Sequence, residues 1–241
     1  ELGAEVSSSI VIVGDSSIGM CVPLTAFDLQ TGRVIWRQPL LQAPHNSPVV
    51  WMVEGKHYLL CNDDLAGKVA CVDPVDGRVL WTVDGGGKST VVISGEVMVV
   101  FSADNHAHLT AYRLSLANPQ RMWGHEHFRG RGESPLIYDG HVYIFGMEGR
   151  AACVNLDTGV VAWEEGIDTG GVSSPIALDG QILVPYAWGK KLMSIRATPS
   201  HYEVLAQGVL SMSWVASPAF SDGRLFLRMK HAVACYELPA N

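Results

Sequence analysis

The stretch Ala70–Trp81, ACVDPVDGRVLW, decides the fold of this chain. It joins two short apolar runs through an Asp/Gly turn and ends in tryptophan, which is the pattern of two strands connected by a tight turn. Close copies occupy Ala26–Trp36 (AFDLQTGRVIW) and Ala152–Trp163 (ACVNLDTGVVAW), and a degenerate copy, AYRLSLANPQRMW, occupies Ala111–Trp123. The four tryptophans are 45, 42 and 40 residues apart. A β-rich repeat of this length predicts a β-propeller with one four-stranded blade per repeat.

A second signal has the same period. A Ser-Pro pair precedes a short apolar run, a tight turn and another apolar run, and Asp-Gly in such a turn favours a β-hairpin because glycine accepts a positive φ. The Ser-Pro pairs begin at Ser47, Ser134, Ser174 and Ser217, and the turns are VEGK at Val53–Lys56, YDGH at Tyr138–His141, LDGQ at Leu178–Gln181 and SDGR at Ser221–Arg224.

About six repeats fill the chain, so we predict an all-β protein with a single propeller domain, residues 1–241. The predicted blades are residues 6–40, 45–83, 89–128, 133–167, 172–209 and 215–238. The fifth repeat lacks the tryptophan, and Leu205 stands at its predicted place. The last repeat ends after its third strand. Either Glu1–Val6 supplies the fourth strand, or the chain is the C-terminal part of a larger propeller.

The phrase A-x-D-x-x-T-G-x-x-x-W resembles the tryptophan-docking repeat of the pyrroloquinoline-quinone-like (PQQ-like) β-propeller family. That family includes quinoprotein alcohol dehydrogenases, the lipoprotein propeller of the bacterial outer-membrane assembly machine and unassigned secreted propellers of planctomycete and verrucomicrobial type. The Ser-Pro and Asp-Gly phrasing, with the ending LFLRMKHAVACYEL, is most similar to the last group. The resemblance covers essentially the whole chain and implies a periplasmic or secreted location.

The docking repeat predicts which side chains join the blades. A large indole covers apolar area and its N–H seeks an acceptor, so the four repeat tryptophans are expected to be structural. Asp28 and Asp73, in the turns, are expected to help tie neighbouring blades together. Cys71, Cys153 and Cys235 share one slot in three repeats, too far apart to bridge, and are expected to be buried small apolar residues. We therefore expect five free thiols.

Composition excludes some functions. The formal net charge of −7 argues against nucleic acid as a partner. No apolar run approaches the roughly 20 residues that a transmembrane helix needs.

Blade topology sorts the loops by face. The loop between the second and third strands lies on the same face as the loop to the next blade, and the other two turns lie opposite. We predict that the first face binds a protein partner or a small anionic ligand through its cations and loop tryptophans. The alternative is ordinary solvated charge, with loop tryptophans that pack on their own blades. These residues are Lys88, Arg129, Arg131, Arg150, Trp188, Lys190, Lys191, Trp214 and Lys230. The opposite turns are mainly acidic, with Asp15, Glu54, Asp76, Asp139, Asp157, Asp179 and Asp222.

Two His-x-His pairs fall in the third repeat. They are His106 with His108 in ADNHAHL, and His125 with His127 in GHEHF. Alternate residues of an extended segment point the same way, so each pair could chelate zinc, copper or nickel. The alternative is a set of unrelated surface histidines.

The cofactor apparatus of the quinoprotein enzymes is not found in this sequence. Those enzymes hold PQQ and calcium with adjacent cysteines, acidic and amide ligands and a catalytic aspartate, and neither a Cys-Cys pair nor a matching ligand set occurs here. The GGGKS stretch, Gly85–Ser89, also lacks the earlier glycine of a phosphate loop. We predict a non-catalytic binding or scaffold propeller with no assigned catalytic residue. The alternative is a PQQ-dependent alcohol dehydrogenase-like quinoprotein or its degenerate relative.

Overall fold

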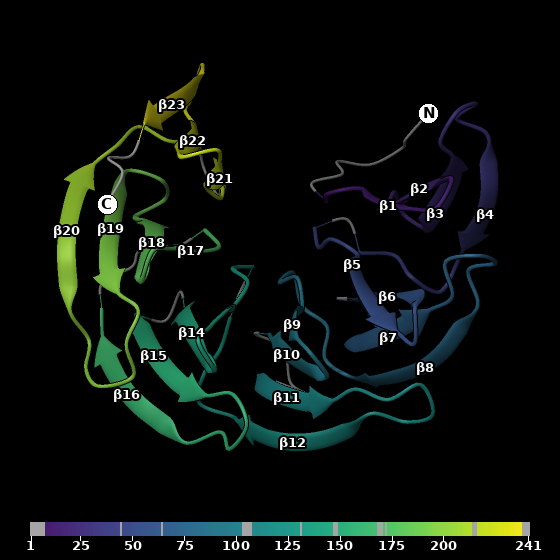
Figure 1. Cartoon of the computed structure of the whole chain (residues 1–241), viewed down its shortest axis with the longest axis horizontal. Coiled ribbons are helices and arrows are strands. Elements are labelled where there is room, and N and C mark those ends of the chain that lie inside the picture. The colour runs from purple at the N-terminus through teal and green to yellow at the C-terminus, as the bar shows by residue number, and fades with distance from the viewer. Residues whose placement is uncertain are drawn as a thin grey trace. The chain divides into compact units, whose positions relative to one another are not determined.

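A computed structural model describes residues 8–43, 45–63, 65–102, 108–130, 132–146, 149–167, 171, 173–213 and 216–237. The chain divides into two compact units, Glu1–Gly132 and Glu133–Asn241, which we call unit 1 and unit 2. Within the described residues the regular structure is antiparallel β-sheet (Figure 1).

Unit 1 contains three four-stranded sheets, each with its strands in chain order. The first sheet consists of β1 (Val11–Val13), β2 (Ser16–Met20), β3 (Leu24–Asp28) and β4 (Val34–Gln38). The second consists of β5 (Val49–Val53), β6 (Lys56–Asp63), β7 (Lys68–Val72) and β8 (Val79–Asp84). The third consists of β9 (Val92–Ser94), β10 (Val97–Phe101), β11 (Leu109–Arg113) and β12 (Gln120–His125).

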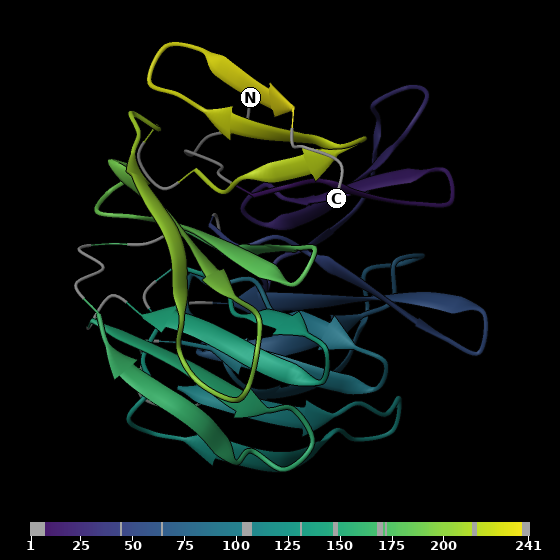
Figure 2. The same cartoon turned by 60° about the vertical axis from the view of Figure 1, so that its left-hand side comes forward.

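Unit 2 also contains three sheets. Figures 1 and 2 show that the fifth sheet lies between the fourth and the sixth. The fourth sheet consists of β13 (Leu136–Tyr138), β14 (His141–Gly146), β15 (Arg150–Asn155) and β16 (Val161–Gly166). The fifth consists of β17 (Ile176–Leu178), β18 (Gln181–Tyr186), β19 (Lys191–Arg196) and β20 (Val204–Val209). The sixth consists of β21 (Ala219–Ser221), β22 (Arg224–Arg228) and β23 (Val233–Glu237) among the described residues.

Each sequence repeat therefore folds into one small antiparallel sheet, as a propeller blade requires. Within each unit, the apolar core lies between consecutive sheets. Ile18 of the first sheet shares a buried cluster with Leu59 of the second, and Tyr143 of the fourth shares one with Val184 of the fifth. The predicted all-β propeller fold is confirmed, whereas the assignment of residues 1–241 to one domain stays a prediction.

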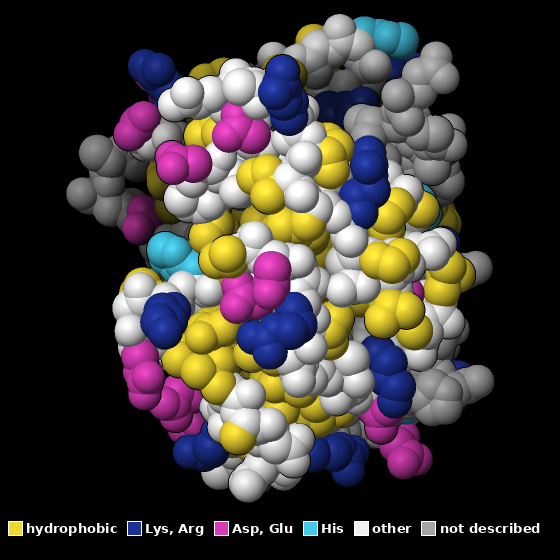
Figure 3. Space-filling view, turned by 90° about the vertical axis from the view of Figure 1, so that its right-hand side faces the viewer, with side chains coloured by type: hydrophobic (Ala, Val, Ile, Leu, Met, Phe, Trp, Pro, Cys, Tyr) yellow, Lys and Arg dark blue, Asp and Glu magenta, His cyan; other side chains and the backbone are white. Residues whose placement is uncertain are grey.

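The tight turns follow the predicted chemistry. Tyr138 pairs with His141, so Asp139 and Gly140 form a two-residue hairpin loop. Their φ angles are 45° and 68°, the left-handed values that a hairpin turn of this kind needs. On the side of the molecule in Figure 3, hydrophobic side chains lie among charged side chains of both signs.

The docking tryptophans join neighbouring blades inside each unit. In unit 1, Trp36 Nε1 donates a hydrogen bond of 2.9 Å to Pro74 O in the turn of the second sheet. Its ring lies over Gly77, where an added Cβ would approach Trp36 Cε3 to 2.6 Å. In unit 2, Trp163 Nε1 donates to Thr198 O at 2.8 Å in the turn of the fifth sheet. Trp36 and Trp163 thus each connect their own blade to the next one through packing and a hydrogen bond.

Trp81 packs in the same way but lacks the polar half of the contact. Its side chain is buried, with 8% of its area exposed, yet its Nε1 has no hydrogen-bond partner among the described residues. The turn that follows β11 reads SLANP, without the Asp-x-x-x-Gly sequence that shapes the other turns. The altered turn of the third repeat therefore explains why the buried indole of Trp81 keeps its apolar contacts but has no hydrogen-bond acceptor among the described residues.

The turn aspartates were predicted to tie neighbouring blades together, but the hydrogen bonds that their side chains accept come from their own turns. Asp28 Oδ1 accepts bonds from the backbone N and Oγ1 of Thr31, at 2.7 and 2.5 Å, and Asp73 Oδ1 accepts one from Val75 N at 2.9 Å. Both aspartates therefore close their own turns. The bonds from Thr31 lower the pKa of Asp28, since they stabilise the carboxylate.

The Ser-Pro positions supply a second tie between blades. Ser9 N donates to Ser47 Oγ at 2.8 Å, and Ser47 N donates to Thr90 Oγ1 at 3.1 Å, which links the three sheets of unit 1. In unit 2, Ser134 N donates to Ser174 Oγ at 2.9 Å. A hydroxyl at the start of the second, third and fifth blades thus receives a backbone N–H from the start of the preceding blade, which accounts for the serine or threonine at these positions.

The fifth blade departs from the sequence prediction. In the first four blades the docking tryptophan pairs with the β-strand residue directly before a β-bulge, as Trp163 pairs with Cys153. In the fifth blade the residue in that register is Ala206, which pairs with Ser194. The prediction of Leu205 is therefore wrong by one residue, because the turn between these strands is longer than in the fourth blade.

The five cysteines are free thiols in this structure. Burial raises the pKa of the thiols of Cys71 to about 12 and of Cys153 to about 11, since desolvation disfavours the thiolate. Cys61 is buried and its pKa is raised as well. The prediction that Cys235 is buried is wrong, because β23 is the outer strand of the described part of its sheet and Cys235 is exposed.

Thiol labelling should separate these cysteines by rate. In native protein, Cys235 should react first with Ellman's reagent, since reaction requires an accessible thiolate, and Cys61, Cys71 and Cys153 should react much more slowly. Denatured, unreduced protein should give five thiols. A fast class of three or more in native protein, or a count of three after denaturation, would contradict this assignment.

Candidate functional site

The strongest candidate surface lies in unit 2, where two loops meet the segment between the fifth and sixth sheets. Leu210 N donates to Lys190 O at 2.8 Å and Met212 N donates to Gly189 O at 3.0 Å. On the other side, Lys230 N donates to Ser211 O at 3.2 Å. The backbone therefore holds the β18–β19 loop and the β22–β23 loop against one segment. We call Trp188, Lys190, Lys191 and Lys230 the loop surface.

Trp188 is the aromatic residue of this loop surface. Its side chain is 45% exposed, whereas docking Trp163 is 8% exposed. Ala187, Trp188 and Gly189 have φ angles of 53°, 58° and 78°, which are unfavourable for the two residues that carry a Cβ. Trp188 N donates to Gly171 O at 3.1 Å, and the ring lies against Gly171, where an added Cβ would approach the ring to 2.7 Å. The indole is therefore presented to solvent by a fixed loop.

The predicted cations of unit 2 have different environments. Lys190 and Lys230 are exposed and pair with no carboxylate in the described part of the chain. Lys191 Nζ lies 5.7 Å from the centre of the Tyr186 ring, within range of a cation–π contact. Arg150 forms an ion pair with Glu164 on the neighbouring strand. The net positive charge of the loop surface therefore comes from its three lysines.

In unit 1, the structure describes two of the predicted cations. Lys88 and Arg129 are both exposed, and the Cβ of Lys88 lies 3.8 Å from the place of a Cβ on Gly132. Lys88 therefore lies beside the segment that contains Arg129. Arg131 of unit 1 and Trp214 of unit 2 lie outside the described residues.

The structure does not test the predicted metal site, because it does not describe all four histidines. His106 lies outside the described residues, and His108 is half-buried. The rings of His125 and His127 are 5.6 Å apart and perpendicular, and both pack against Phe128. Among the described residues, no three or more His, Cys, Asp or Glu side chains come together in a group that could hold a metal ion. The His-x-His metal site stays a prediction.

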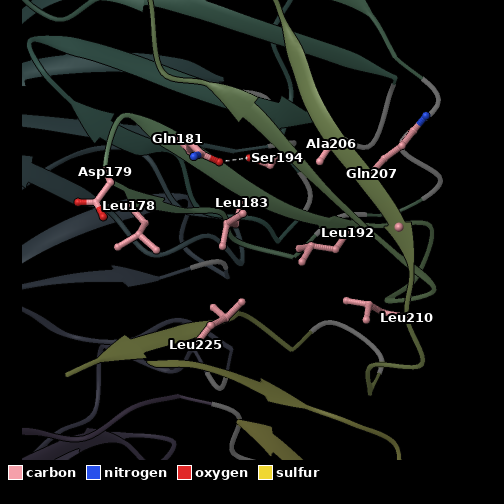
Figure 4. A pocket seen from close by; sticks show the side chains of 11 residues that line it. Leu178, Asp179, Gln181, Leu183, Leu192, Ser194, Ala206, Gln207, Leu210 and Leu225 are labelled. Carbon is pink, nitrogen blue, oxygen red and sulfur yellow. Dashed lines mark hydrogen bonds between the residues drawn. The ribbon is translucent and has the colours of Figure 1, made fainter. Parts of the chain in front are cut away.

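Sequence reasoning missed a cavity in unit 2. It has a volume of about 520 Å³ and lies between the fifth sheet and Leu225 of β22 (Figure 4). Its walls include Leu183, Leu192, Leu210 and Ala206, and a hydrogen bond of 2.7 Å from Ser194 Oγ to Gln181 Oε1 crosses one side. The absent tryptophan of the fifth repeat was the sequence signal that could have located it.

The family model and the curated relatives that match this sequence agree on one family. The family model described as "Outer membrane protein assembly factor BamB" matches residues 22–184. BamB of Salmonella typhimurium is 24% identical over 174 residues, and BamB of Escherichia coli is 22% identical over the same length. Each match covers 67% of this chain and 42% of the relative, so the chain spans about two fifths of the length of these curated relatives.

Two solved structures show the same fold. BamB from Moraxella catarrhalis has a TM-score of 0.75 at 15% identity, covering 94% of this chain and 70% of that one. The computationally designed Ika8 protein has a TM-score of 0.70 at 14% identity, covering 97% and 71%. These identities support the propeller fold alone. The finer similarity to planctomycete-type propellers stays a prediction.

Proposed function

Because the chain belongs to the family of the outer membrane protein assembly factor BamB, we propose that it is a non-catalytic, protein-binding propeller. Its loop surface in unit 2 contacts an acidic segment of a partner protein. The family membership favours this scaffold over a quinone-dependent dehydrogenase, since the matched description names an assembly factor and not an oxidoreductase.

Trp188 is the observation that carries this proposal. Tryptophan is enriched among the residues that dominate binding energy, and an aromatic ring already fixed in its bound position loses little conformational entropy on binding. The contact with Gly171 and the left-handed backbone hold the ring of Trp188 in place before a partner arrives. The loop surface therefore has the pre-organised anchor that a protein-binding site needs.

The lysines determine the charge of the partner. Lys190 and Lys230 flank one backbone segment, and Lys191 lies next to Lys190 in the chain. The opposite turns of unit 2 carry the exposed aspartates Asp139, Asp157, Asp179 and Asp222. An acidic partner is therefore attracted to the loop surface and repelled by the opposite turns. In unit 1, Lys88 and Arg129 supply further candidate contacts of the same charge.

The proposed location is extracytoplasmic, as the names of the relatives suggest. Within the described residues, the structure contains no helix that is long and apolar enough to cross a membrane.

The test is a pull-down from a cell-envelope extract of the source organism, with the captured proteins quantified by mass spectrometry. A variant with Trp188→Ala, Lys190→Glu and Lys230→Glu should lose at least 90% of a partner's recovery, because it removes the anchor and reverses two charges. The matched control carries Asp139→Asn, Asp157→Lys and Asp222→Asn on the opposite turns. Asparagine tolerates the φ of 45° and 50° at positions 139 and 222.

The control should retain the partner that the wild type captures, and both variants should keep the wild-type circular dichroism spectrum. Loss of the partner in the control, with recovery in the loop-surface variant, would place the site on the acidic turns. Equal recovery in all three proteins would remove the loop surface from the binding site.

A further inference from the structure

The cavity in unit 2 lies at a position that holds an indole in the first four blades. Trp36, Trp81, Trp123 and Trp163 pair with the third-strand residue before the bulge, and Ala206 takes that register in the fifth blade. Trp81 and Trp163 are each 8% exposed, whereas Ala206 is exposed. The fifth blade therefore lacks the ring that fills the interface with the next blade.

Among the described residues, the buried cluster at this interface contains Met212, Leu225 and Leu227, with Leu183 and Leu210 partly buried against it. Leu183 and Leu192 are only partly buried and face the cavity (Figure 4). The walls are mainly apolar and include the polar residues Asp179 and Gln207, so a small aromatic molecule held there would remove apolar surface from water.

One polar group distinguishes this cavity from the equivalent places. The residue that pairs with the docking position is Ala26, Cys71, Ala111 or Cys153 in the first four blades, but Ser194 in the fifth. Ser194 Oγ donates its hydrogen to Gln181 Oε1, which orients the hydroxyl. The lone pairs of Oγ then remain able to accept a hydrogen bond from a ligand in the cavity.

We propose that this cavity is a binding site for a small, flat, bicyclic aromatic molecule of the indole class. Its ring takes the place of the missing tryptophan side chain between β18–β20 and β22, and its N–H donates to Ser194 Oγ. None of the four residues of the loop surface lines the cavity, although Leu210 of the cavity wall bonds through its N–H to Lys190 O.

Indole itself is the probe. At ten times its dissociation constant, which we expect below about 1 mM, indole should raise the melting temperature of the wild-type chain by roughly 3–6 °C. Ala206→Trp should fill the cavity with the chain's own ring, so the variant should melt at a higher temperature than the wild type and show no further shift with indole.

Leu183→Phe is the second cavity-filling variant, in case Ala206→Trp folds poorly. It narrows the cavity from the β18 wall and should weaken indole binding at least 5-fold by calorimetry. Leu205→Trp is the matched control, since it adds the same ring one residue away in β20, at the position that the sequence alone indicated. It should bind indole with the wild-type affinity.

Ser194→Cys tests the role of the hydroxyl. It installs the residue found in the second and fourth blades and should weaken indole binding roughly 3- to 10-fold through loss of a neutral hydrogen bond. Binding of naphthalene, which has no N–H, should stay within 2-fold. Absence of indole binding to the wild type, or equal binding to wild type and a folded Ala206→Trp variant, would overturn the proposal. Equal loss of both ligands in Ser194→Cys would overturn the hydrogen bond to Ser194.

Discussion

Trp163→Ala should lower the free energy of unfolding by about 3–5 kcal/mol, the range for truncating a large buried aromatic residue. The indole is 8% exposed, lies 5.4 Å from the Tyr202 ring and 6.1 Å from the Tyr143 ring, and donates its N–H to Thr198 O. Truncation removes these contacts and leaves the partly buried carbonyl oxygen of Thr198 without its donor. Urea denaturation followed by circular dichroism measures the loss.

Two further variants give this measurement its controls. Trp188→Ala removes the same side chain from the exposed loop surface and should cost less than about 1 kcal/mol. Trp81→Phe should cost less than Trp163→Phe by about 1–2 kcal/mol, because Trp81 Nε1 has no partner to lose whereas Trp163 Nε1 does. A loss below 1 kcal/mol for Trp163→Ala would show that the indole does not join the fourth and fifth blades.

Gly77→Ala should destabilise unit 1 by about 2–5 kcal/mol, through backbone strain and overpacking together. Gly77 has a φ of 75°, and a Cβ there would lie 2.6 Å from Trp36 Cε3, so the docked indole would have to move. That movement would also stretch the hydrogen bond from Trp36 Nε1 to Pro74 O. The measurement is again the free energy of unfolding in urea, followed by circular dichroism.

Gly55→Ala isolates the backbone part of this effect. Gly55 has the same φ of 75°, but an added Cβ there meets nothing within 4 Å. Its substitution should therefore cost only the strain, about 1–2 kcal/mol. If Gly55→Ala and Gly77→Ala are equally destabilising, Gly77 does not serve as the platform for the indole of Trp36.

Much of the fold could be predicted because the local signals repeat. The spacing of the tryptophans and the Asp-Gly turns defines the strands directly, and Asp139–Gly140 adopts the expected hairpin loop. The pairing register of the strands is harder to predict from the sequence of an irregular repeat. Leu205 was the predicted counterpart of the tryptophans, but strand pairing after a longer turn places Ala206 there. The sequence showed that the fifth repeat lacks the tryptophan, but the residues that line the resulting cavity depend on this register and on the packing of β22.

The candidate site could be predicted only as a set of loops. Topology indicated that Trp188 and Lys190 belong to one loop, but the exposure of Trp188 depends on three left-handed backbone angles and the contact with Gly171. Arg150 forms an ion pair with Glu164 because strand pairing brings these two residues together. This pairing distinguishes Arg150 from Lys190 and Lys230, which have no such partner among the described residues. Side-chain environments of this kind arise from tertiary packing, and a charge count cannot supply them.

The most direct test of the proposed function is site-specific photo-crosslinking in living cells of the source organism. A photo-reactive phenylalanine analogue replaces Trp188 on the loop surface in one strain and the exposed Asp157 on the opposite turns in another. We expect position 188 to crosslink to a discrete protein partner, with the yield reduced by Lys190→Glu and Lys230→Glu, and position 157 to give no such product. A discrete crosslink from position 157 together with none from position 188 would contradict the assignment of the loop surface as the protein-binding site.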